Sequence, residues 1–187
     1  MPEKILKIKE RFEMEYREME YKLGQVGPAG GIVFTKYEYQ NYKTIDRILY
    51  LEAIPANYEF NAAWGLLDKS APTSESIGAT RGKHNTEAIV AASIGEESAA
   101  GRCINLTFGG YKDWFLPDVL ALERMYEWRY TIGGFKKEIY WSSTEGGHWG
   151  GTERDALIVS FINGESSHAY KASELRVRAV REFMVLL

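Results

Sequence analysis

Apolar residues near the start of the chain recur with the 3.6-residue period of an α-helix, and Glu, Lys and Arg fill the opposite side. The apolar positions are Ile5, Ile8, Phe12, Tyr16, Met19 and Leu23. Gly24 follows as a natural C-terminal stop. The pattern predicts an amphipathic helix over residues 3–23, which packs either on its own domain or against other copies of the chain.

The next part of the chain has the apolar runs of two short strands. A turn cluster at Gly27-Pro28-Ala29-Gly30-Gly31 precedes a strand expected over residues 32–34. A second strand is expected over residues 48–54, where Pro55 stops it. The polar, Tyr-rich segment 37–46 between them is either a loop or the tip of a hairpin.

The middle of the chain combines a long irregular segment with three predicted helices. Residues 55–84 show little periodicity, and such loops are usually functional or packed by their own side chains. Helices are expected over residues 85–92, 96–106 and 118–128. The third follows a Pro-Asp pair, which favours a helix start. Cys103 lies on the apolar side of the second helix, and we expect it to be buried.

The last part of the chain has the pattern of β-structure. Strands are expected over residues 139–143, 156–162, 165–171 and 175–180. Asn163-Gly164 joins the second to the third and is a strong hairpin signal. Helices followed by a late antiparallel sheet predict an α+β fold.

The final predicted strand carries arginines within an apolar run. Arg176 and Arg178 need partners if they are buried, because an isolated buried charge is expensive. Asp113 and Glu52 are candidate carboxylates. This arrangement indicates a structural network of ion pairs.

Composition limits the classes of partner. The chain has 187 residues, enough for one domain with an appendage, and a formal charge of −3 gives no general argument for nucleic acid. Aromatic residues reach 13%, which suits a recognition surface as well as a core. Cys103 is alone, so no disulfide forms within the chain. We expect no signal peptide, because no apolar h-region opens the sequence, and no membrane span, because no apolar run reaches about 18 residues. A cell surface, a virion and the cytoplasm all remain open.

Several motifs along the chain carry a family resemblance. They occur in this order: Gly27-Pro28-Ala29-Gly30-Gly31-Ile32-Val33-Phe34, Tyr50-Leu51-Glu52-Ala53, Trp64-Gly65, Asn105-Leu106-Thr107, Gly110-Tyr111-x-Asp113-Trp114-x-Leu116-Pro117, Tyr140-Trp141-Ser142-Ser143, Phe161-x-Asn163-Gly164 and Arg176-Val177-Arg178-x-Val180-Arg181. As a set they resemble the C-terminal domain of collagen-like bacterial adhesins, over roughly residues 24–183. That family is mostly of unknown function.

The resemblance implies a C-type lectin-like fold, which formylglycine-generating-enzyme-like domains share. The same fold occurs in the variable proteins of diversity-generating retroelements, including phage receptor-binding proteins. It implies a C-type lectin-like domain over residues 25–187, preceded by an amphipathic helix over residues 1–24. In those variable proteins the diversified ligand surface lies in the C-terminal part of the domain.

Carried over to this sequence, the resemblance implies an exposed ligand-binding surface in two places. One is the loop after Trp141-Ser142-Ser143, and the other is the polar strand of the predicted hairpin. The implied residues are Glu145, His148, Trp149, Thr152, Glu153, Arg154, Ser166, His168 and Tyr170.

The chain departs from the better-known members of this fold. It lacks the disulfide pairs of sugar-binding C-type lectins and their Glu-Pro-Asn and Trp-Asn-Asp calcium tripeptides. Calcium-dependent carbohydrate binding is therefore not expected. A single cysteine also cannot supply the paired thiols of the formylglycine-generating enzymes.

The residues give no pattern for catalysis or a cofactor. His84, His148 and His168 have no metal-ligand spacing. Ser142-Ser143 lacks the Gly-x-Ser-x-Gly elbow of a nucleophile, and Gly27-Pro28-Ala29-Gly30-Gly31 fits neither a P-loop nor a dinucleotide fingerprint. We therefore expect no metal, no cofactor and no enzyme activity.

The resulting hypothesis is a non-enzymatic binding domain for a protein or glycan on another surface. A diversified variable protein of a retroelement is one concrete form. Two alternatives remain: a diverged enzyme of the formylglycine-generating type, and a structural module that assembles into a homo-oligomer through residues 3–23.

Overall fold

The computed structural model describes residues 20–41, 44–67, 69–71, 81–93, 96–147 and 150–187. Most of the helix predicted over residues 3–23 lies outside these ranges. The described end of it is not helical: residues 20–23 form a bend and the start of a turn, so the prediction is wrong at this end. The predicted helix does not continue to this point because the Gly24 N–H donates to the carbonyl of Val33, which holds Gly24 beside the first strand.

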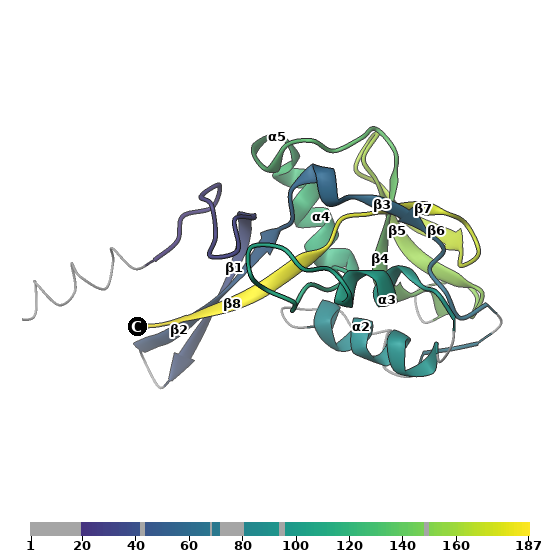
Figure 1. The fold of residues 1–187 in the computed structure, drawn as a ribbon, viewed down its shortest axis with the longest axis horizontal. Helices are drawn as coiled ribbons and strands as arrows, with labels where there is room; N and C mark the ends of the chain where they lie inside the picture. The colour runs from purple at the N-terminus through teal and green to yellow at the C-terminus, as the bar shows by residue number, and fades with distance from the viewer. Residues whose placement is uncertain (1–19, 42–43, 68, 72–80, 94–95, 148–149) are drawn as a thin grey trace, which may run out of the picture.

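An antiparallel sheet of three strands extends from the body of the molecule (Figure 1). It joins the beginning of the chain to its end, because the last strand pairs with the second one. In the order in which they lie side by side, its strands are β1 (Ile32–Asn41), β2 (Thr44–Ala53) and β8 (Val180–Leu186). β1 and β2 form a hairpin, which confirms the hairpin alternative for residues 37–46.

The second sheet has five strands and lies in the body of the molecule. Its strands, in spatial order, are β3 (Phe60–Ala62), β7 (Leu175–Val177), β4 (Ile139–Glu145), β5 (Asp155–Ser160) and β6 (Ser166–Tyr170). β5 and β6 are antiparallel, which confirms the predicted Asn-Gly hairpin. β4 and β7 are parallel, so the sheet is mixed and the expectation of a purely antiparallel sheet is wrong.

Helices cover both faces of the five-stranded sheet (Figure 1). They are α2 (Arg81–Ala92), α3 (Ala99–Ile104), α4 (Val119–Glu127) and α5 (Arg129–Ile132), with a 3₁₀ turn η1 (Ala56–Tyr58). Trp141 and Ile158 face the core on the side of α2 and α3, whereas Tyr140 and Val159 face the core on the side of α4. Burial on both faces is seen along nearly the whole of β4 and β5, and it explains why the middle of β5, Ala156 to Val159, is continuously apolar. Helices and sheets together make the fold α+β.

The predicted helices exist, with shifted ends. α4 is nearly as expected, because Asp118 caps it by accepting the Ala121 N–H at 2.8 Å. α3 begins only after Ser98, whose side chain accepts the Gly101 N–H at 3.0 Å. In the described part of the chain, no helix is long and apolar enough to span a membrane.

The strand predicted over residues 175–180 is wrong as a single element. The chain leaves the five-stranded sheet after Val177 and enters the three-stranded sheet at Val180. Arg178 and Ala179 lie at the crossing, where the Ile54 N–H donates to the Ala179 carbonyl at 3.0 Å and Arg178 Nε donates to the Ile54 carbonyl. These bonds come from a segment more than 120 residues earlier, so no local pattern marks the break.

The arginines near the end of the chain have carboxylate partners, as the sequence predicts, although the pairing differs and Arg176 is only partly buried. Glu52 and Asp113 both bind Arg181, at 2.8 Å each. Arg178 instead pairs with Glu59, and Arg176 with Glu138, both at 2.8 Å.

Glu52 and Arg181 join three parts of the fold. Glu52 also accepts the backbone N–H groups of Ala29 and Gly31, at 3.2 and 3.0 Å, so the Gly27–Gly31 turn is held to β2. Asp113, the second partner of Arg181, lies in the loop before α4, so this ion pair holds that loop against β8. Burial acts to raise the pKa of Asp113, but the hydrogen bond and charge of Arg181 outweigh it and lower that pKa below its ordinary value.

Replacing Arg181 by Met should destabilise the protein by about 3–5 kcal/mol, because Glu52 would be left buried and charged. The free energy of unfolding in urea measures the effect. Arg124→Met is the matched control, since Arg124 and Glu127 form an exposed pair whose loss should change stability by less than about 1 kcal/mol. Equal effects of the two substitutions would contradict a structural role for Glu52 and Arg181.

Candidate ligand-binding surface

The hairpin strand β6 and the loop before β5 form a polar surface at the edge of the five-stranded sheet. The site residues exposed there are Thr152, Glu153, Arg154, Ser166 and Tyr170. His168 is half-buried, while His148 and Trp149 lie outside the described residues. Five of the nine residues implied by the resemblance are thus exposed on this part of the protein.

Strand geometry places three of these residues on one face. Ser166, His168 and Tyr170 are two positions apart, so their side chains leave β6 on the same side. Ser166 Oγ donates to Glu123 Oε1 on α4 at 2.5 Å, which identifies this side as the one that α4 covers. The side chain of Tyr170 is 44% exposed at the end of the strand.

The loop before β5 is fixed at its base by hydrogen bonds. Asp155 Oδ2 accepts both the N–H and the hydroxyl of Thr152, at 2.9 and 2.7 Å. The Lys171 N–H donates to the carbonyl of Arg154 at 2.9 Å, which ties the loop to the end of β6. The hydroxyl of Thr152, followed by its N–H, lowers the pKa of Asp155 below the ordinary value.

His168 packs on the same loop. A Cβ added at Gly151 would come within 2.6 Å of His168 Cδ2, and one at Gly146 within 3.0 Å, so the two glycines leave room for the ring in this orientation. His168 Nε2 is buried and has no hydrogen-bond partner among the described residues. The imidazole therefore supports the loop and offers only part of its surface to a ligand.

Glu145 is not part of the exposed surface, so its predicted exposure is wrong. Its side chain is 1% exposed and pairs with Lys171, whose side chain is 0% exposed. Ser70 Oγ and the Ala71 N–H also donate to the Glu145 carboxylate, at 2.9 and 3.1 Å. β4 continues two residues beyond its predicted end, which carries Glu145 inward beneath the residue 69–71 segment.

Lys171 completes this buried pair from the other side. Its Nζ donates to the Lys69 carbonyl at 2.9 Å and lies 4.8 Å from the centre of the Trp64 ring. Because Lys171 directly follows β6, the pair anchors the base of the proposed surface to the core. The sequence gives no local signal for this pair, whose partners are 26 residues apart and meet a third segment.

The Trp-Ser-Ser motif (Trp141-Ser142-Ser143) connects neighbouring segments through hydrogen bonds. Trp141 Nε1 donates to the Ala62 carbonyl at 3.0 Å, and Trp64 Nε1 donates to the Ser142 carbonyl at 2.8 Å. Ser142 Oγ donates to the Leu157 carbonyl at 2.8 Å, and the Ser143 N–H donates to the Pro117 carbonyl at 2.8 Å. These contacts give the motif a structural role, as its lack of a nucleophile elbow suggests.

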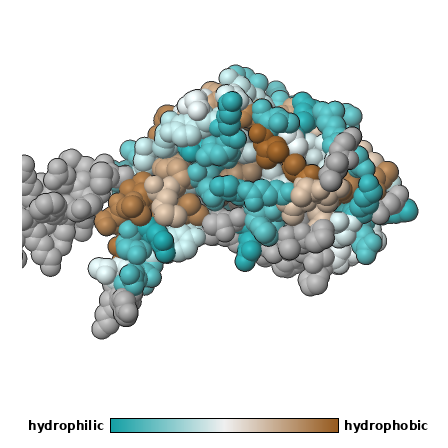
Figure 2. Space-filling model, turned by 60° about the horizontal axis from the view of Figure 1, so that its bottom comes forward, coloured by the Kyte–Doolittle hydropathy of each residue, from teal (hydrophilic) through white to brown (hydrophobic). Residues whose placement is uncertain are grey.

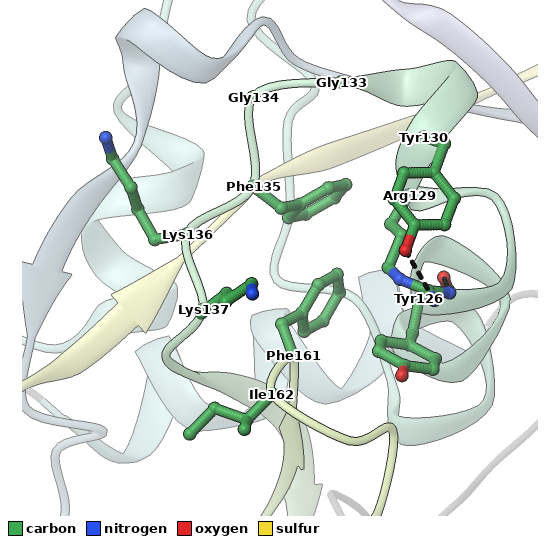
Figure 3. Close-up of a pocket in the computed structure, with 10 residues that line it drawn as sticks. All are labelled: Tyr126, Arg129, Tyr130, Gly133, Gly134, Phe135, Lys136, Lys137, Phe161 and Ile162. Carbon is green, nitrogen blue, oxygen red and sulfur yellow. Dashed lines mark hydrogen bonds between the residues drawn. The ribbon is translucent and has the colours of Figure 1, made fainter.

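A cavity of about 390 Å³ lies beside the turn of the β5–β6 hairpin and was not predicted from the sequence (Figure 3). Residues of α4 and α5, the segment that follows α5, and the segment after β5 line it. In the sequence, the Gly133-Gly134 pair is the feature that could have indicated a turn of the chain around a cavity. Both glycines have positive φ, 76° and 74°, and let the chain turn around the cavity after α5.

Metal and thiol chemistry find no support in the residues that the structure describes. No group of three His, Cys, Asp or Glu side chains could hold a metal ion among them. His84 is exposed on α2. Cys103 is fully buried, as expected, and burial raises the pKa of its thiol well above the ordinary value, which makes it an inert core residue.

No model of a known protein family matches the chain, and no curated protein matches it.

Replacing Lys171 by Met should destabilise the protein by about 3–5 kcal/mol, because Glu145 would remain buried without its cation. The double variant Lys171→Met with Glu145→Leu should recover much of that loss, since both charges are then absent. Urea unfolding of the two single variants and the double variant measures the coupling. Additive effects would contradict the buried pair.

Proposed function

We propose that this protein is a non-enzymatic binding domain that recognises a protein or glycan on another surface through β6 and the loop before β5. We further propose that its fold is C-type lectin-like and that it is related to the collagen-like adhesins and to the variable proteins of diversity-generating retroelements. The resemblance of its motifs supports the kinship. The ligand-binding residues are those exposed on this surface, together with His148 and Trp149 by their place in the sequence.

The main support for the proposal is that the residues beneath this surface are buried, whereas residues on its outer side are exposed. Beneath it, Glu145 and Lys171 are sealed in the core and Trp141 is completely buried. Outside, Arg154 and Tyr170 are exposed within the same hairpin. A stiff base lowers the entropy that binding would otherwise cost in ordering the contact residues.

The relation between two motifs also supports the proposed fold. In the related variable proteins, the ligand surface lies on a scaffold similar to the segment from Trp-Ser-Ser to Arg-Val-Arg in this chain. Tyr140 of β4 pairs directly with Arg176 of β7. On its other edge, β4 pairs with β5, the first strand of the hairpin that carries exposed residues. The two motifs thus lie side by side, next to the proposed surface.

The contact chemistry suits macromolecular recognition. Arg and Tyr are frequent hot-spot residues, because both bury a large contact area and keep polar groups available for hydrogen bonds. Ser166, Thr152 and Glu153 add hydrogen-bonding groups around them. An interface of this composition binds through a few side chains while the frame stays unchanged.

Replacing Arg154 or Tyr170 by Ala should weaken binding at least tenfold, or about 1.4 kcal/mol, and leave the melting temperature nearly unchanged. Arrays of defined glycans and of purified cell-surface proteins identify a bound probe, and titration of that probe measures the loss. Lys112→Ala is the control, since Lys112 is also exposed but lies in the loop before α4. Unfolding by both substitutions, or unchanged binding, would contradict the proposed surface.

The genomic setting separates the diversified form of this function from a fixed one. A reverse transcriptase gene and a near-copy of the DNA for residues 140–181 beside the coding sequence would support diversification. Their absence would leave a binding domain of constant sequence.

Assembly through the N-terminal segment is a second candidate function, favoured by the free end of the three-stranded sheet. Met184 and Leu186 are 49% and 69% exposed there. Figure 2 shows hydrophobic side chains gathered at this narrow end of the molecule. Tyr21 and Leu23, at the end of the segment predicted to assemble (residues 3–23), pack against this sheet.

Removal of residues 1–19 should convert an oligomer to a monomer if that segment joins copies of the chain. Light scattering of the full chain and of the shortened chain measures the mass. An oligomer of unchanged mass after the deletion would exclude this role.

A further inference from the structure

The cavity beside the hairpin turn has aromatic walls (Figure 3). Phe135 and Phe161 stack with their ring centres 4.4 Å apart and an angle of 29° between their planes. Tyr130 stands on the other side and is 84% exposed. An aromatic side chain so exposed gains little from the fold itself, whereas a ring bound between it and the phenylalanines would bury apolar area on both faces.

A guanidinium group is held at the same side of the cavity. Arg129 lies 4.0 Å from the centre of the Tyr126 ring and 4.3 Å from that of Tyr130. It donates to the Tyr126 carbonyl at 2.7 Å and to the Tyr130 hydroxyl at 3.3 Å. These contacts fix the orientation of Arg129 without neutralising its charge, because none of them is a carboxylate.

A second cation approaches from the opposite side. Figure 3 shows the Lys137 side chain directed toward Phe161, whereas Lys136 points away from the cavity. The backbone carrying both lysines is fixed, because the Lys136 N–H donates to the Tyr140 hydroxyl at 2.8 Å. Lys137 is exposed and forms no ion pair with any residue that the structure describes.

The charge of the cavity is therefore positive. No acidic side chain is among its lining residues in the described part of the chain. The carboxylates nearest in sequence pair with other cations: Glu127 with Arg124 at 2.6 Å and Glu138 with Arg176 at 2.8 Å. An anion entering the cavity would meet two cations at its walls and no competing carboxylate.

We propose that this cavity binds a small ring-bearing anion, meaning a carboxylate or phosphate attached to an aromatic ring or a sugar ring. The ring lies between Tyr130 and the Phe135–Phe161 pair, and the anionic group lies between Arg129 and Lys137. A volume of about 390 Å³ suits a ligand of one or two rings. This site does not depend on the proposed function of β6 and its loop.

Matched small molecules test the proposal on the full chain. Benzoate is compared with benzamide, which keeps the ring and loses the charge, and with acetate, which keeps the charge and loses the ring. Glucuronate and glucose form the corresponding pair for a sugar ring. Chemical-shift changes on titration give each Kd.

The expected result is that at least one charged ring compound binds about tenfold more tightly than its neutral counterpart and than acetate, since a charged hydrogen bond contributes about 1.5–3 kcal/mol. Benzoate as the tighter ligand identifies an aromatic acid, and glucuronate identifies a sugar acid. Equal binding of charged and neutral ring compounds, or no binding of either acid, overturns the proposal.

Variants then locate the ligand. Lys137→Gln and Tyr130→Ala should each weaken binding of the acid about tenfold, because they remove a cation and a ring wall. Lys136→Gln is the matched control, with the same change of charge one residue away on a side chain that points outward. Melting temperatures verify that all three variants fold. An equal loss in Lys136→Gln and Lys137→Gln overturns the assigned site.

Discussion

Ion pairs between buried residues far apart in the sequence hold the long connections of this protein to its sheets. Glu52 with Arg181, Glu59 with Arg178, and Glu145 with Lys171 each combine a strand or its end with a distant segment. In each pair at least one partner also bonds to backbone groups of a loop: Glu52 to the Gly27–Gly31 turn, Arg178 to Gly133, and both Glu145 and Lys171 to the residue 69–71 segment. A buried pair contributes little net stability relative to an apolar pair, but breaking it is costly. Moving one of these loops would separate the pair and leave a buried charge without its partner, so each pair disfavours other positions of that loop.

This arrangement separates the residues that specify the fold from those that face solvent. Lys171 is sealed in the core, while Tyr170, its neighbour in sequence, is 44% exposed. Tyr170 ends β6 and Lys171 directly follows it, so one hairpin carries an exposed residue and a buried one side by side. Substitutions at the exposed positions leave the buried pair intact, which is the physical condition for a surface that can change without loss of the fold.

The sequence predicts the elements whose signals are local. The Asn163-Gly164 hairpin and the Asp118 cap of α4 depend on a few neighbouring residues, and both are found as expected. The break between β7 and β8 and the burial of Glu145 depend on Ile54 and on the segment at Ser70. No periodicity reports such distant partners, so these features could not be read from the chain. The site residues were implied by the motif resemblance: Thr152, Glu153, Arg154, Ser166 and Tyr170 are exposed as implied, whereas Glu145 is buried.

The hairpin turn connects the two proposed binding regions physically. Gly164 has a φ of 85°, and a Cβ there would come within 2.3 Å of the Tyr126 ring. Glycine is thus required twice, for the turn and for the close approach of Tyr126. Tyr126 in turn stacks on Arg129, the cation at the wall of the cavity. The turn that sets the register of β6 therefore also sets the position of that cation. A side chain such as Tyr170 can be replaced without touching this turn, whereas a side chain at Gly164 would displace Tyr126 and with it the wall of the cavity.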